Sequence, residues 1–141
     1  MLDQDEQSIM DMVDREAIRN VVNAYYDAIW RDDIEAVVQL FAPDGSMSVA
    51  NGALGGNAPV GHEQLRDFYT KGVKVMTPRP FSHNHVVELL GKGRATGRSY
   101  VELRSSIDLS WVAAVIYQDE YIKVGRAWKL QTRRAALQNI K

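Results

Sequence analysis

The chain has 141 residues, of which 45% are hydrophobic and 25% charged, and its formal net charge is −1. These values are typical of one globular domain and indicate neither disorder nor a surface for nucleic acid or an anionic membrane. The absence of cysteine excludes disulfides, thiolate catalysis and cysteine-ligated metals. The acidic first ten residues lack the apolar stretch of a signal peptide, and no run approaches a membrane span of roughly 18 apolar residues. We therefore expect a cytoplasmic protein.

The first half of the chain has the pattern of helices. Apolar residues at helical spacing predict a helix from Asp14 to Trp30, which leaves residues 1–13 as an N-terminal extension of a domain that spans residues 14–141. This helix presents one apolar stripe, which consists of Ile18, Val21, Val22, Tyr25 and Ile29. A short second helix is expected to begin after Asp32 as its N-cap.

Turn residues follow the second helix. The sequence Pro43-Asp44-Gly45 is expected to end that helix, and a short strand is predicted from Ser46 to Ala50. The glycine-rich stretch from Asn51 to Gly61 is expected to be a loop at the mouth of a cavity. A third helix is predicted near His62 to Val75.

From Phe81 onward the apolar pattern changes to a period of two, which indicates strands. Residues 94–104 alternate, residues 109–117 are apolar on both faces as in a central strand, and residues 127–137 complete the sheet. Helices followed by strands predict an α+β fold. We expect a curved antiparallel or mixed sheet that wraps around the N-terminal helices and encloses a pocket.

Three segments resemble the SnoaL-like family of the nuclear transport factor 2-like superfamily, which has a cystatin-like cone fold. They are EAIRNVVNAYYDAIWRDDIEAVVQLFAPDGSMSV, HNHVVELLGKGRATGRSYVELR and DEYIKVGRAWKLQTRR, and together they cover about residues 14 to 136. The resemblance implies the fold. It does not specify a reaction, because this superfamily carries dehydratases, isomerases, hydrolases, cyclases and binding modules.

The resemblance to bile-acid 7α-dehydratase, scytalone dehydratase and ketosteroid isomerase implies two catalytic residues. His83 corresponds to the histidine that moves a proton in the dehydratases, and Tyr25 corresponds to the tyrosine that polarises the substrate. The chain departs from both patterns. Trp30 occupies the position of the dehydratase aspartate, and the isomerase base corresponds to about Val49.

Strand alternation predicts that Phe81, His83 and His85 share one face, so that all three face the cavity if Phe81 does. An imidazole there could act as general acid or base, or it could be a core histidine with a structural hydrogen bond. Two histidines lack the third ligand of a metal site, so we expect no metal. The residues predicted to line the pocket are Tyr26, Trp30, Phe41, Phe81, His85 and Trp111.

The later strands carry three charged residues that could bear on function, Arg134, Asp119 and Glu120. Arg134 shares alternation parity with Trp128 and Leu130, so it would anchor a ligand carboxylate if that face is inward, or form a salt bridge at the cone mouth. Asp119 and Glu120 are expected to be charges at a strand edge.

We expect a cofactor-independent lyase or isomerase that acts on an apolar hydroxylated or keto substrate of steroid, polyketide or aromatic size. His83 would move the proton and Tyr25 would hold the substrate oxygen. The alternative is a non-catalytic ligand-binding module or an assembly module associated with an oxygenase. A homodimer is expected in either case, with the outer sheet face around Arg98 and Tyr100 as a polar interface.

Overall fold

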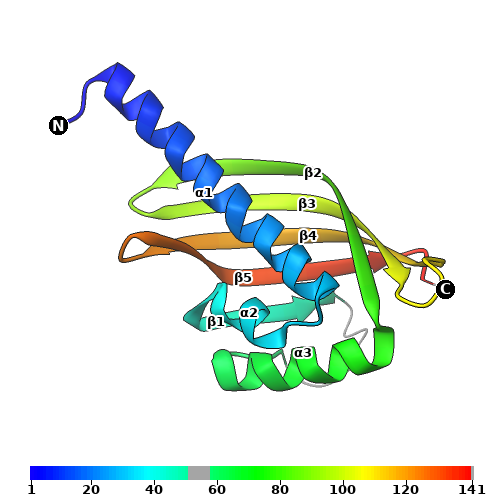
Figure 1. Cartoon of the computed structure of the whole chain (residues 1–141). Coiled ribbons are helices and arrows are strands. Elements are labelled where there is room, and N and C mark those ends of the chain that lie inside the picture. The colour runs from blue at the N-terminus through cyan, green and yellow to red at the C-terminus, as the bar shows by residue number, and fades with distance from the viewer. Residues whose placement is uncertain (51–57, 141) are drawn as a thin grey trace.

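A computed structural model describes residues 1–50 and 58–140 of the chain (Figure 1). Most of the predicted glycine-rich loop, residues 51–57, lies outside the described residues. In chain order the elements are α1 (Gln4–Trp30), α2 (Ile34–Gln39), β1 (Phe41–Val49), α3 (His62–Met76), β2 (Pro78–Gly91), β3 (Arg94–Ser105), β4 (Trp111–Val124) and β5 (Ala127–Gln138).

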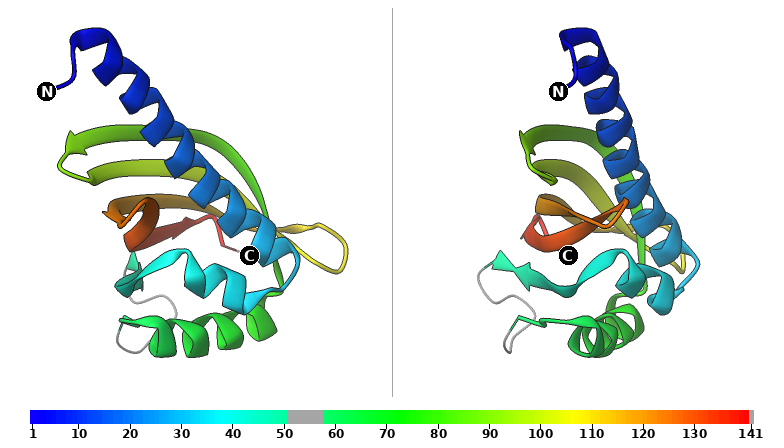
Figure 2. Two further views of the ribbon diagram at one scale, coloured as in Figure 1. Left: turned by 60° about the vertical axis from the view of Figure 1, so that its left-hand side comes forward. Right: turned by 90° about the vertical axis from the view of Figure 1, so that its left-hand side faces the viewer.

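The five strands form one mixed sheet in the order β1-β5-β4-β3-β2. The β1–β5 pair is parallel, and the other three pairs are antiparallel. The sheet is curved, and α1 crosses its inner face diagonally (Figures 1 and 2). The helix α3 lies beside the edge strand β1 (Figures 1 and 2). The predicted α+β fold with a curved mixed sheet around N-terminal helices is confirmed.

The first helix begins ten residues earlier than predicted. The Asp3 side chain caps it by accepting a hydrogen bond from the Glu6 amide at 2.8 Å. The carboxylates of Asp5 and Glu6 in the first turn interact favourably with the positive end of the helix dipole. Residues 1–13 therefore include the first turns of α1. None of the helices among the described residues is long and apolar enough to cross a membrane.

The connection from α2 to β1 differs from the prediction in two respects. Asp33, not Asp32, is the N-cap of α2, because its carboxylate accepts a hydrogen bond from the Ala36 amide at 3.0 Å. Pro43-Asp44-Gly45 lies in a wide bulge of β1 rather than in a turn, since α2 has already ended at Gln39. Gly45 is required there because a Cβ would lie 2.9 Å from the Leu130 carbonyl oxygen.

The hydrophobic core lies between α1 and the inner face of the sheet. Ile18, Val22, Tyr25 and Ile29 of the predicted apolar stripe are all buried. A tight turn joins β4 to β5, with Gly125 at a φ of 63° that favours glycine. Packing of α1 on the sheet thus places Tyr25 and Tyr26 in the interior.

Candidate functional site

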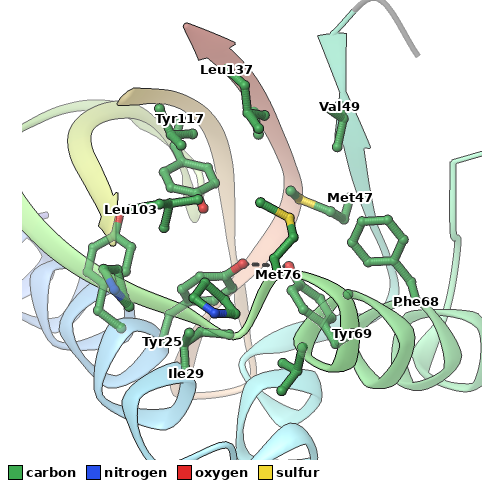
Figure 3. Close-up of a pocket in the computed structure, with 17 residues that line it drawn as sticks. Tyr25, Ile29, Met47, Val49, Phe68, Tyr69, Met76, Leu103, Tyr117 and Leu137 are labelled. Carbon is green, nitrogen blue, oxygen red and sulfur yellow. Dashed lines mark hydrogen bonds between the residues drawn. The ribbon is translucent and has the colours of Figure 1, made fainter. Parts of the chain in front are cut away.

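A small cavity of about 80 Å³ lies between α1, α3 and the inner face of the sheet (Figure 3). Its lining is mostly apolar and includes Tyr25, Ile29, Met47, Phe68, Tyr69 and Tyr117. No acidic, basic or histidine side chain is among the described residues that line it. The polar groups available to a ligand are therefore phenols.

Two of these phenols form a hydrogen-bonded pair. The hydroxyl of Tyr25 on α1 lies 2.7 Å from the hydroxyl of Tyr69 on α3, although the residues are 44 positions apart (Figure 3). Burial raises the pKa of both phenols, so both stay protonated near neutral pH. One hydroxyl donates to the other, and among the described residues neither has a further hydrogen-bond partner. One O–H of the pair is therefore free to donate to a ligand oxygen.

Arg133 lies behind the tyrosines and is completely buried. Its guanidinium carbon is 4.2 Å from the centre of the Tyr25 ring and 3.8 Å from that of Tyr117, which are cation–π distances. Its Nη2 donates to the Tyr26 hydroxyl at 2.7 Å, and its Nε lies 3.1 Å from Asp119 Oδ1. Burial opposes the guanidinium charge, but Asp119 and the phenols more than offset this, so the pKa of Arg133 is raised.

A chain of hydrogen bonds joins this buried pair to His85 on β2. The Tyr121 hydroxyl donates to Asp119 Oδ2 at 2.8 Å, so the Nε2–H of His85 is the donor to Tyr121 at 3.1 Å. Burial, followed by the charges of Arg133 and Arg19, lowers the pKa of His85 to about 4. His85 is therefore neutral near pH 7.

A β-bulge in β2 separates the two histidines. Ser82 pairs with Val101 and His85 with Ser99, so two residues of β2 oppose one of β3. This extra residue reverses the side-chain alternation, because one residue of slip moves each side chain to the opposite face. Contrary to the predicted alternation, His83 and His85 lie on opposite faces: His83 contacts Glu102 on the outer face, and His85 contacts the buried Tyr121 on the inner face.

The side chain of His83 is 55% exposed, and its Nε2 lies 2.6 Å from Glu102 Oε2 on the outer face of β3. Glu102 also accepts a hydrogen bond from Arg104. His83 is not among the residues that line the cavity, whereas Tyr25 is. The structure therefore does not bring together the two residues predicted to be catalytic.

Of the six residues predicted to line the pocket, only Tyr26 lines this cavity among the described residues. Phe41 lies in the core and packs against Tyr69. Trp30 and Phe81 form a half-exposed pair with ring centres 5.4 Å apart. Trp111 donates to the carbonyl oxygen of Asn139. His85 faces the same side of the sheet as the cavity but contacts Tyr121 instead.

Sequence reasoning missed Arg133 because it assumed an uninterrupted last strand. It missed the burial of Asp119, although this residue alternates in register with the buried Tyr117 and Tyr121 of β4, because a carboxylate was expected at a strand edge. A second bulge, in which Tyr121 pairs with Leu130 but Glu120 pairs with Thr132, reverses the alternation of β5 at Gln131. Arg133 therefore points inward instead of Arg134, and it holds Asp119, which is buried rather than at a strand edge. Tyr69 could have been found, since it belongs to the apolar side of the predicted third helix.

No cluster of three or more potential metal ligands is present in residues 1–50 and 58–140. Among solved structures, the chain is similar to a protein of unknown function with a cystatin-like fold from Nostoc punctiforme PCC 73102, with 21% identity over 90% of this chain and 92% of that chain and a TM-score of 0.80. The chain is also similar to an NTF2-like protein from Novosphingobium aromaticivorans, with 17% identity over 99% of this chain and 92% of that chain and a TM-score of 0.80. A proposed aromatic ring hydroxylase from the same organism has 24% identity over 89% of this chain and 90% of that chain, with a TM-score of 0.69.

These likenesses show the class of fold, a cystatin-like cone. The comparison with curated proteins gave no match. The model of the SnoaL-like domain family matches residues 10–134, and the chain belongs to that family.

Proposed function

We propose that the cavity binds a small, largely apolar molecule through one carbonyl or hydroxyl oxygen. The observation that carries this proposal is the Tyr25–Tyr69 pair, which offers one free O–H inside an otherwise apolar site. A buried donor of this kind favours ligands that have an acceptor, because leaving it unpaired costs about 1 to 3 kcal/mol.

The size of the cavity favours a ligand no larger than one small ring. Sites for drug-sized molecules have roughly 300 to 1,000 Å³, and a cavity of about 150 Å³ holds benzene. With about 80 Å³, this cavity suits a compact ketone or alcohol better than a steroid or polyketide. A larger ligand would require α3 to move away from the sheet.

A lyase or isomerase is the second candidate, and the position of Tyr25 favours it. A protonated phenol aimed at a carbonyl stabilises the negative charge that develops during enolisation. Such a reaction also needs a proton acceptor, and no described lining residue is one at neutral pH. Binding without chemistry therefore has more support than catalysis.

The test of binding uses two probes of equal shape, cyclopentanone and methylenecyclopentane, of which only the ketone accepts a hydrogen bond. We expect the wild-type protein to bind the ketone more tightly. The double variant Tyr25→Phe with Tyr69→Phe removes both hydroxyls of the pair and should weaken ketone binding by about 2- to 13-fold, which corresponds to about 0.5 to 1.5 kcal/mol. The hydrocarbon should bind both proteins equally. Binding is followed by NMR, with Tyr100→Phe on the outer face as the matched control. Equal affinity for both probes in the wild type would contradict the proposal.

The catalytic candidate is tested by turnover of β-hydroxy ketones and of β,γ-unsaturated ketones. If His83 acts as the acid or base, His83→Ala lowers turnover by about 10² or more. If only Tyr25 takes part, Tyr25→Phe lowers turnover and His83→Ala does not. If the wild-type protein turns over none of these ketones, the catalytic candidate is rejected and binding remains as the proposed function.

A further inference from the structure

The first turns of α1 project beyond the sheet as an arm, defined here as residues 1–13 (Figures 1 and 2). Asp14 is the residue at which the helix is tied to the sheet. Its Oδ1 accepts hydrogen bonds from Trp128 Nε1 at 3.0 Å and from Lys123 Nζ at 3.4 Å. The residues before Asp14 are almost all exposed.

The arm carries exposed apolar side chains on the helix face that points away from the sheet of its own chain. Ile9 is 60% exposed and Val13 is 56% exposed. Each lies nine positions before a buried residue of the apolar stripe, namely Ile18 and Val22. At about 100° per residue, nine positions place two side chains on opposite faces of a helix. Ile9 and Val13 therefore point away from the sheet, and covering them requires another molecule.

The charge of the arm indicates what kind of surface would cover it. The arm, residues 1–13, holds four carboxylates and no Lys or Arg, a charge of −4. The other 128 residues hold all 17 basic side chains against 14 of the 18 acidic ones, a charge of +3. Two arms packed side by side would repel each other, so the arm needs a basic partner with apolar side chains.

Such a surface exists at the same end of the molecule, on the tips of the β2–β3 and β4–β5 hairpins (Figure 1). Leu90 is 56% exposed and Val124 is 41% exposed. They are flanked by the exposed basic residues Lys92, Arg94 and Arg126, none of which has an ion-pair partner within the described part of the chain. The tips therefore match the arm in both charge and apolar character.

We propose that the arm of one copy docks on the hairpin tips of a second copy. Because arm and tips lie at one end of each molecule, two copies related by a two-fold axis would exchange both contacts at once, as an isologous interface requires. Ile9 and Val13 would cover Leu90 and Val124, and the carboxylates of Asp5 and Glu6 would face the basic residues of the tips. The proposal does not depend on what the cavity binds.

The test is a charge swap followed by sedimentation velocity. We expect the wild-type chain to dimerise, less tightly as salt is raised. Asp5→Lys with Glu6→Lys should weaken dimerisation at least about tenfold, and so should Lys92→Glu with Arg126→Glu. An equimolar mixture of the two variants should restore the dimer, because each mixed dimer has two attractive contacts. Glu63→Lys with Asp67→Lys on α3 is the control for an equal change in charge and should leave dimerisation unchanged.

A second measurement locates the contact, since the natural chain has no cysteine. Met12→Cys and Val124→Cys are made in separate chains, mixed and treated with a short bismaleimide. A cross-linked pair of unlike chains is the expected product. A wild-type chain that stays monomeric would overturn the proposal. So would a dimer that survives both charge variants and gives no cross-link, because the copies would then meet elsewhere, for example on the outer sheet face.

Discussion

Arg133 and Asp119 form an ion pair with a separation of 3.1 Å, and both side chains are completely buried beneath α1. The pair connects the cavity to the strands, because Arg133 contacts the rings of Tyr25 and Tyr117 while Asp119 is bonded to Tyr121. A buried charge without its partner is strongly destabilising, whereas an apolar replacement of both partners is often tolerated.

We therefore expect Arg133→Met and Asp119→Leu each to lower the free energy of unfolding by about 3 to 5 kcal/mol. The double change Asp119→Leu with Arg133→Met should cost less than the two single changes added together, because no charge is then left unpaired. Urea denaturation of all variants completes the double-mutant cycle. Strict additivity would show that the two side chains stabilise the fold independently.

Gly97 makes room for Tyr121. A Cβ at Gly97 would lie 2.8 Å from the Val86 carbonyl oxygen and 2.9 Å from Cε2 of Tyr121. Gly97→Ala should therefore lower the free energy of unfolding by about 1 to 3 kcal/mol and displace the Tyr121 ring from His85. The matched control is Gly72→Ala on α3, where a Cβ meets nothing within 4 Å, and it should stabilise by about 0.5 to 1 kcal/mol. Equal effects in urea denaturation would contradict the prediction.

The buried tyrosines predict loss of stability in alkali. Burial raises the pKa of Tyr25, Tyr69, Tyr117 and Tyr121 in the folded state. The unfolded chain then releases protons above its phenol pKa of about 10 while the folded chain keeps them. Stability is therefore full below about pH 10 and falls above it, by up to about 1.4 kcal/mol per pH unit for each phenol.

Urea denaturation at a series of alkaline pH values measures this slope, and ultraviolet absorbance follows ionisation of the phenols. Tyr117→Phe should reduce the slope by the contribution of one phenol, up to about 1.4 kcal/mol per pH unit. A slope that is unchanged in this variant would mean that Tyr117 ionises in the folded protein as readily as in the unfolded one.

His85 predicts a loss of stability in acid. Its pKa is lowered to about 4, below the value of about 6.5 in an unfolded chain. The unfolded state therefore binds a proton first as the pH falls, so the contribution of His85 is full above about pH 6.5 and is lost between there and about pH 4. The imidazole NMR signals of His85 should titrate near pH 4, and His85→Gln should flatten the pH dependence of stability in this range. A midpoint near 6.5 would contradict the prediction.

The sequence alone determined the class of fold. Helical spacing in the first half and alternation in the second half are local patterns, which can be read from the order of the apolar residues. It also placed Tyr25 in the interior, since that residue lies on the apolar stripe of α1. Only the tertiary structure decided which charged and histidine side chains face inward. The bulges before His85 and at Gln131 reverse the alternation, and they depend on pairing with neighbouring strands rather than on a local signal. The Tyr25–Tyr69 pair likewise required α1 and α3 to meet, a contact that the residue pattern of either helix cannot specify.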